Sequence, residues 1–147
     1  MEALKRKKGS KGQSKLSEKQ FKILDEIIIL DVLTLDITEG CSTEEEQIKA
    51  LTKYILEKLS YKSEYTKQEL NDHNDNPINY ALNCQEGLCI NYASLFTAMA
   101  NRLGIDTYQI YSSTHTWNML CNNEIPSFID LTMLDTETII EVINGTT

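Results

Sequence analysis

The chain has 147 residues, of which 41% are hydrophobic, with four cysteines and a formal net charge of −8. This length suits one domain with a real core and leaves little room for a second. No apolar run approaches the roughly 20 residues that a transmembrane helix needs, so no membrane span is expected. The cysteines are too sparse for a disulfide scaffold, although their even number would permit disulfides in an exported protein.

The beginning of the chain is basic and the rest is acidic. Residues 1–22 carry a net charge of +6, and the remaining residues carry −14. Since the basic segment has neither interleaved aromatics nor an amphipathic pattern, we interpret residues 1–20 as a solvated, disordered tail rather than a tether to nucleic acid, membrane or the acidic body. Residues 21–147 are then a single domain, whose acidity argues against a nucleic-acid enzyme. No apolar stretch follows the basic residues as in a signal peptide, so a cytoplasmic location is expected if the chain is complete.

Two helices are predicted in the first part of the domain. The segment FKILDEIIILDVL has apolar residues at helical spacing, although its isoleucines leave a strand as an alternative. Its expected apolar side consists of Phe21, Leu24, Ile28 and Val32. The next segment, STEEEQIKALTKYILEKLSY, has Ser42 as its expected N-cap and Glu45 at the capping-box position. The apolar stripe of this second helix, which we interpret as ordinary core, consists of Ile48, Leu51, Ile55 and Leu59.

Residues 60–80 are polar and irregular. NDHNDNP is the strongest loop signal in the chain, so a loop is predicted there. His73 lies within it, surrounded by Asn and Asp. We interpret this histidine as a solvated surface group rather than a ligand.

A third helix and three strands complete the predicted elements. CINYASLFTAMANRLG favours a helix from Cys89, with Gly104 just past its end. The apolar side of this helix consists of Tyr92, Leu95, Phe96, Met99 and Leu103. The apolar period then changes to two, which predicts strands in DTYQIYSS, HTWNMLC and SFIDLT, the last two joined across NNEIP. Helices followed by an antiparallel sheet are the α+β pattern.

Cys89 stands where a turn meets the third helix. The thiolate is the reactive form of cysteine, and the first turn of a helix offers unpaired N–H groups and partial positive charge that favour an anion. The same N–H groups can hold the oxyanion formed when a thiolate attacks a carbonyl. Gly87, two residues earlier, is expected to let the backbone turn tightly and leave an open approach to the sulfur. Taken alone, Cys89 is better explained as a small buried side chain at a helix start.

Two further residues shift this interpretation toward an enzyme. His115 lies at the start of the strand HTWNML, and Asp130 lies within the following strand, FIDLT. If the two strands are hairpin neighbours, both side chains can lie on one face within reach of each other. A carboxylate that orients a histidine, which in turn deprotonates a cysteine, is the general arrangement of an activated nucleophile.

The order of GLCINYASLFTAMANRLGI, HTWNML and FIDLT resembles the transglutaminase-like superfamily. The resemblance is strongest over residues 83–132 and extends loosely back to residue 42. It implies a papain-like α+β core in which Cys89 is the nucleophile, His115 the general base and then acid, and Asp130 the group that orients the histidine. It also places Trp117 near the site, and we expect Gly87 and Trp117 to be the substrate-binding residues. Thr116 departs from the family pattern, which commonly has a small apolar residue there.

This resemblance implies acyl transfer from an amide of a protein or peptide substrate. By analogy with small members of the family, we expect a cysteine peptidase-like hydrolase, with a transglutaminase or deamidase as the alternative. A non-catalytic peptide-binding module is the alternative from another class. No metal or organic cofactor is expected, since the Cys84 and Cys89 spacing suits zinc poorly and no calcium loop is present. A redox pair of Cys84 and Cys89 is permitted by their separation but not required.

Overall fold

The computed structural model describes residues 16–121 and 126–136. Residues 1–15 of the expected tail and most of NNEIP lie outside them, whereas residues 18–20 of that tail belong to the first helix. The helices and strands follow one another along the chain in this order: α2 (Glu18–Ile37), α3 (Glu44–Lys58), β1 (Ser60–Tyr61), α4 (Lys67–Asp75), α5 (Pro77–Cys84), β2 (Glu86–Gly87), α6 (Cys89–Arg102), β3 (Thr107–Tyr111), β4 (Thr116–Leu120), β5 (Ser127–Ile129) and α7 (Leu131–Thr136). Most helices precede one small antiparallel sheet, which confirms the α+β class.

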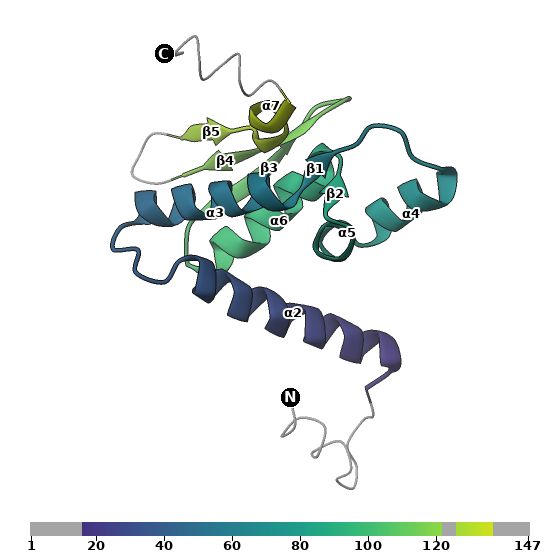
Figure 1. The fold of residues 1–147 in the computed structure, drawn as a ribbon, viewed down its shortest axis with the longest axis horizontal. Helices are drawn as coiled ribbons and strands as arrows, with labels where there is room; N and C mark the ends of the chain where they lie inside the picture. Colours follow the sequence, from purple (N-terminus) through teal and green to yellow (C-terminus); the bar gives the residue numbers. More distant parts are fainter. Residues whose placement is uncertain (1–15, 122–125, 137–147) are drawn as a thin grey trace, which may run out of the picture.

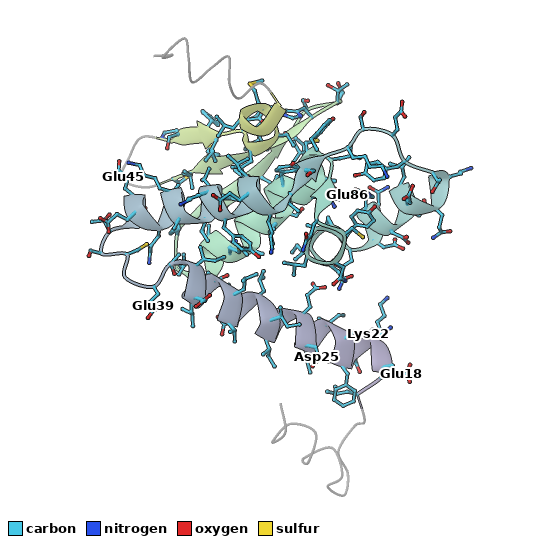
Figure 2. All side chains as sticks on the ribbon, viewed as in Figure 1. Glu18, Lys22, Asp25, Glu39, Glu45 and Glu86 are labelled. Atoms are coloured by element: carbon cyan, nitrogen blue, oxygen red, sulfur yellow. The ribbon has the colours of Figure 1, made fainter. Side chains whose placement is uncertain are left out.

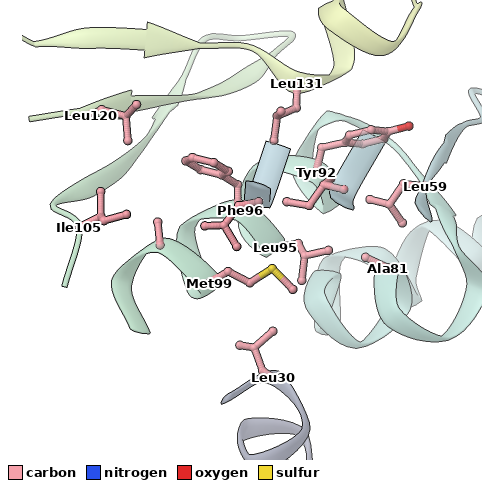
Figure 3. Packing of buried hydrophobic residues seen from close by; sticks show 13 residues of the cluster. Leu30, Leu59, Ala81, Tyr92, Leu95, Phe96, Met99, Ile105, Leu120 and Leu131 are labelled. Carbon is pink, nitrogen blue, oxygen red and sulfur yellow. The ribbon is translucent and has the colours of Figure 1, made fainter. Parts of the chain in front are cut away.

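Helix α6 lies at the centre of the molecule. It contacts α2, α3, α5 and α7 as well as strands β3 and β4, and Figure 1 shows it between the sheet and the N-terminal helices. Its buried side chains meet those of the surrounding elements in a single core (Figure 3). That core consists of Leu30, Leu51, Ile55, Leu59, Ala81, Tyr92, Leu95, Phe96, Met99, Ala100, Ile105, Leu120 and Leu131. The predicted apolar sides of α3 and α6 are thereby confirmed.

The start of α3 lies one residue later than expected. Thr43, and not Ser42, is the N-cap, and Glu46 takes the capping-box position expected for Glu45. Both hydroxyl residues could cap a helix. Thr43 does so because the Glu46 carboxylate then accepts from two successive backbone N–H groups, those of Ser42 (2.6 Å) and Thr43 (3.3 Å).

Helix α2 is confirmed as a helix, but its buried face is not the expected one. Leu30 and Thr34 are buried, whereas Ile28 and Val32 are exposed, Val32 by 63%. Apolar residues occur on all sides of this helix, so their spacing alone cannot select the side that packs. Figure 2 shows side chains projecting all round α2, with the charged Glu18, Lys22 and Asp25 on its N-terminal part.

The predicted loop over residues 60–80 is wrong, because two short helices occupy most of it. Thr66 is the N-cap of α4, and its bonds with Glu69 complete a capping box and lower the pKa of that carboxyl. Asn76 is the N-cap of α5, with Pro77 at the first helical position. The Asn and Pro of NDHNDNP therefore end one helix and begin the next.

Strands β3, β4 and β5 form an antiparallel sheet in that order. Tyr111 pairs with Thr116 and Asn118 with Ile129, which fixes the register of the whole sheet. His115 directly precedes β4 and Asp130 directly follows β5. Both were expected within strands, and both lie one residue outside them. A separate two-stranded parallel pairing joins β1 to β2. Among the described residues, no helix has both the length and the apolar character to cross a membrane.

Candidate active site

Cys89 is the first residue of α6 and is half-buried. The preceding Leu88 is the N-cap residue, with an extended backbone that the Asn91 side chain stabilises by accepting the Leu88 N–H at 2.8 Å. As the first residue of the helix, Cys89 has no intrahelical acceptor for its backbone N–H. The expected place of the thiol at a helix N-terminus is therefore confirmed.

Gly87 serves the local backbone in a different way from the one expected. It lies in β2 opposite Tyr61, and the residue with left-handed backbone is Gln85, with φ of 57°. A Cβ at Gly87 would lie 2.6 Å from the Cβ of Asn91, closer than real Cβ contacts allow. Glycine is thus required here for the close approach of Asn91. A contact of Gly87 with substrate stays a prediction.

Hydrogen bonds between α6 and the sheet define their relative direction. Strand β3 follows the C-terminal end of α6, and Gln109 Nε2 in β3 reaches back to Ser94 Oγ in α6 at 3.2 Å. Strand β4 is antiparallel to β3, and Asn118 Nδ2 in β4 donates to the Ala93 carbonyl oxygen at 3.3 Å. Strand β4 therefore runs in the same direction as α6.

Cys89 and His115 consequently lie at the same end of the helix–sheet layer. Cys89 precedes Ala93 by four residues, about 6 Å along a helix at 1.5 Å per residue. His115 precedes Asn118 by three residues, about 10 Å along a strand at 3.3 Å per residue. Both residues lie beyond the contact of Ala93 with Asn118 in the same direction.

His115 and Asp130 are in direct contact, as the hairpin argument predicts. His115 Nε2 lies 2.6 Å from Asp130 Oδ2, and both side chains are partly buried. The other carboxylate oxygen, Oδ1, accepts from Thr132 Oγ1 (3.1 Å) and from the Met133 backbone N–H (3.2 Å). The backbone N–H of His115 is itself held by Ser112 Oγ at 3.0 Å. The carboxylate is thus held through Oδ1, which leaves Oδ2 to accept from the imidazole.

This bond assigns the two nitrogens of the His115 ring. An ionised carboxylate only accepts hydrogen bonds, so Nε2 carries the proton that is donated to Asp130. In the neutral ring, Nδ1 is then unprotonated and able to accept a proton. Trp117, two residues further along β4, stacks on the imidazole with ring centroids 5.7 Å apart and planes 22° from parallel. The indole therefore covers part of the histidine face.

The sequence of the chain matches the family model of the transglutaminase-like superfamily over residues 31–127. The chain belongs to this superfamily. The match includes the helix with Cys89 and the strand that follows His115. Comparison with the curated proteins gives no match.

Solved structures resemble the fold of this transglutaminase-like domain. A protein from Cytophaga hutchinsonii, provisionally named a cysteine protease, superimposes with a TM-score of 0.55 at 17% identity over 81% of this chain and 44% of that chain. A protein named a TGase gives a TM-score of 0.52 at 18% identity over 89% of this chain and 37% of that one. A protein from Parabacteroides distasonis, provisionally named a protease, gives a TM-score of 0.54 at 13% identity over 74% of this chain and 25% of that one. The transglutaminase-like chain thus corresponds to less than half the length of these proteins.

A second histidine of the transglutaminase-like domain lies where the sequence did not place it. His73 is 1% exposed in α4, not solvated in a loop. Its Nδ1 lies 2.6 Å from Asn91 Oδ1, and its ring packs against Tyr80 (centroids 3.7 Å apart) and Tyr65 (4.3 Å). The capping box of Thr66 was the sequence signal that could have placed His73 on a helix.

Polar groups lie near the aromatic cluster of His73, but the described residues form no metal cluster. Burial, with Cys84 and Glu86 nearby, raises the pKa of Tyr80 to about 12, so its hydroxyl stays protonated at neutral pH. Lys62 bonds Glu86 at 3.3 Å. Within the described ranges, no three His, Cys, Asp or Glu side chains are grouped as metal ligands, and all four cysteines are free thiols.

Proposed function

We propose that this transglutaminase-like domain is a cysteine peptidase-like hydrolase that uses Cys89, His115 and Asp130 as a catalytic triad. The observation that carries the proposal is the 2.6 Å bond between His115 Nε2 and Asp130 Oδ2. It supplies an oriented base at the same end of the molecule as a cysteine on a helix N-terminus. An oriented base beside a nucleophile is the arrangement that covalent acyl transfer needs.

The first half of the reaction cleaves the amide. His115 Nδ1 takes the thiol proton of Cys89, and the sulfur attacks the carbonyl carbon, forming a C–S bond and an oxyanion. The backbone N–H of Cys89 stabilises the oxyanion, because no helical carbonyl competes for it. The intermediate collapses with cleavage of the C–N bond, and His115 gives its proton to the departing amine. The product on the enzyme is a thioester.

The second half regenerates the thiol. His115 removes a proton from water, which attacks the thioester, and the proton returns to the sulfur as the carboxylic acid leaves. Asp130 stabilises the imidazolium in both halves by accepting from Nε2. Trp117, stacked on the ring, would restrict its rotation and form one wall of the substrate site. We propose peptides or protein side-chain amides as substrates, on the analogy of the family.

The proposal is tested by acylation of Cys89 with an activated ester, para-nitrophenyl acetate. Peptide mass mapping after a short reaction should find the acetyl group on Cys89 before it is found on Cys41, Cys84 or Cys121. Limited alkylation with iodoacetamide should show the same order. Equal labelling of all four cysteines would rule out Cys89 as a privileged nucleophile and favour the peptide-binding alternative.

The fate of the acyl group separates hydrolysis from transfer. In the wild-type protein the thioester should disappear in water at the rate at which acetate is released. Adding a primary amine should leave that rate and the product nearly unchanged. Predominant formation of an amide with the added amine would instead make the protein an acyltransferase of the transglutaminase type. Cys89→Ala should abolish acylation while leaving the melting temperature nearly unchanged.

A further inference from the structure

A hydrogen-bond network lies directly behind the first turn of α6, and the reaction proposed above does not use it. Its centre is Asn91, which is 0% exposed. Asn91 Oδ1 accepts from the Leu88 backbone N–H at 2.8 Å and from His73 Nδ1 at 2.6 Å. Asn91 Nδ2 donates to the Pro77 carbonyl oxygen at 3.0 Å. The network thus joins α4 and the start of α5 to the residue that precedes Cys89.

The two backbone partners fix the orientation of the Asn91 amide. The N–H of Leu88 can only donate and must face Oδ1, and the carbonyl of Pro77 can only accept and must face Nδ2. His73 is therefore a donor to Oδ1, and its ring carries a proton on Nδ1. The other nitrogen, Nε2, has no hydrogen-bond partner among the described residues.

Packing alone does not explain a histidine at this position. The ring is enclosed by Tyr65 and Tyr80, and a phenylalanine would fill the same aromatic cluster. Burying an imidazole with one nitrogen unpartnered costs free energy that an apolar ring avoids. The donor to Asn91 is the feature that only the histidine supplies.

Asn91 holds Leu88 from both sides. Its side chain accepts the N–H of Leu88, and its own backbone N–H donates to the carbonyl oxygen of Leu88 at 2.9 Å. Because the peptide unit is planar, the direction of this carbonyl sets the direction of the Cys89 N–H. That N–H is the group assigned above to the oxyanion.

We propose that His73 is a positioning residue, which locks Asn91 and through it aims the Cys89 N–H at the oxyanion. This inference rests on the proposed function, because it gives His73 a part in that reaction without contact to the substrate. Gly87 belongs to the same arrangement, since a Cβ there would displace Asn91. The loss of the His73 donor should therefore impair oxyanion formation more than it impairs the thiol itself.

Two substitutions separate the donor from the ring. His73→Phe keeps an aromatic ring and removes the donor, whereas His73→Asn places an amide N–H close to the position of Nδ1 and removes the ring. Asn74→Ala, at an exposed position of the same helix, is the matched control. Each protein is reacted with para-nitrophenyl acetate, whose acyl transfer passes through an oxyanion, and with iodoacetamide, whose reaction with a thiol does not. Modification of Cys89 is followed by peptide mass spectrometry.

We expect acetylation of Cys89 to slow by about 10-fold or more in His73→Phe, because a misdirected donor loses transition-state stabilisation. Alkylation of Cys89 should keep its wild-type rate in the same variant. His73→Asn should recover most of the acetylation rate despite a lower melting temperature. Hydrogen exchange at the Leu88 amide should accelerate in His73→Phe and stay slow in Asn74→Ala.

Three outcomes would overturn the positioning role. These are equal slowing of acetylation and alkylation in His73→Phe, unchanged acetylation in every variant, and the same acetylation loss in His73→Asn as in His73→Phe. If His73→Phe folds poorly, His73→Leu provides a second side chain without a donor. Absence of acetylation at Cys89 in the wild-type protein would overturn the proposed function and the catalytic purpose of the network with it. Faster Leu88 exchange in His73→Phe would then still show that His73 orders this segment.

Discussion

At the residue scale, the two oxygens of Asp130 have separate partners. Oδ2 faces His115, while Oδ1 is held by the Thr132 hydroxyl and the Met133 N–H. All of these partners donate, so the site is built for a group that only accepts. An uncharged amide cannot satisfy all of them.

Asp130→Asn should therefore disable the histidine while leaving the fold intact. The Nδ2 group of the asparagine would face either His115 or the Thr132 and Met133 donors. If it faces the ring, it donates to Nε2, so the proton of the neutral imidazole moves to Nδ1. Nδ1 can then no longer accept the thiol proton. We expect acetylation of Cys89 to fall by up to about 10⁴-fold, the loss known for replacing a triad aspartate by its amide. Asp106→Asn, an exposed carboxylate before β3, is the control and should keep full activity. A near-normal rate in Asp130→Asn would exclude Asp130 from the triad.

Gly87→Ala tests the close contact with Asn91. The added Cβ would lie 2.6 Å from the Asn91 Cβ, so the two residues must separate. We expect a loss of about 1–3 kcal/mol in the free energy of unfolding, typical of overpacking. Urea denaturation of Gly87→Ala, Asn91→Ala and the double variant should show non-additive losses, because a displaced Asn91 already loses hydrogen bonds that Asn91→Ala removes. Additive losses would mean that the two positions are independent.

Local sequence patterns identified some of these residues and missed others. Cys89, His115 and Asp130 each stand beside recognisable flanking residues, and the hairpin argument correctly predicted the contact of His115 with Asp130. The partnership of His73 with Asn91 joins two helices through the tertiary fold. The polar segment around His73 contains no signal that predicts this contact. Its composition therefore indicated a surface group.

At the element scale, side-chain caps decide where the helices begin. Ser17, Thr43, Thr66 and Asn76 each accept a backbone N–H in the first turn of the helix that follows. The sequence analysis used this signal for α3 and missed the capping box of α4, because Asn, Asp and Pro dominate the segment around it. The apolar stripes of α3 and α6 were predictable because each has one clear apolar side. Helix α2 has none.

The end of α5 contains a strained residue. Gln85 adopts a left-handed backbone with φ of 57°, which is unfavourable for a side chain with a Cβ. Gln85→Gly should therefore raise the free energy of unfolding by about 1 kcal/mol. Gln85→Ala, which keeps the Cβ, should bring no comparable gain. Urea denaturation measures both, and a destabilised Gln85→Gly would show that the Gln85 side chain outweighs the backbone strain.

At the scale of the whole molecule, α2 is attached to the core through one narrow face. Leu30 is 6% exposed and belongs to the core, whereas Leu35 is 58% exposed on another side of the same helix. Figure 3 shows Leu30 directed at Met99 and Leu95 of α6. Leu33 and Ile37 pack against the same core, and Asp31 pairs with Arg102 of α6 at 2.7 Å.

Leu30→Ala and Leu35→Ala form a matched pair that tests this attachment. We expect Leu30→Ala to lower the free energy of unfolding by about 2–4 kcal/mol, because it leaves a cavity in the core. Leu35→Ala should change it by less than about 0.5 kcal/mol, as is usual at the surface. Chemical denaturation gives both values. A large loss in Leu35→Ala would mean that the outer face of α2 is covered in solution.

The central place of α6 also divides the candidate site into two unequal halves. Cys89 begins an element that is enclosed by helices on several sides and by the sheet on another. His115 and Asp130 flank strands β4 and β5, of five and three residues; β4 packs on α6, whereas Ser127 and Phe128 of β5 are exposed. Any adjustment to a bulky acyl group should therefore come from the exposed strand β5 rather than from α6. We expect bulky acyl groups to be accommodated by movement of β5, which would set the range of substrates open to the proposed hydrolase.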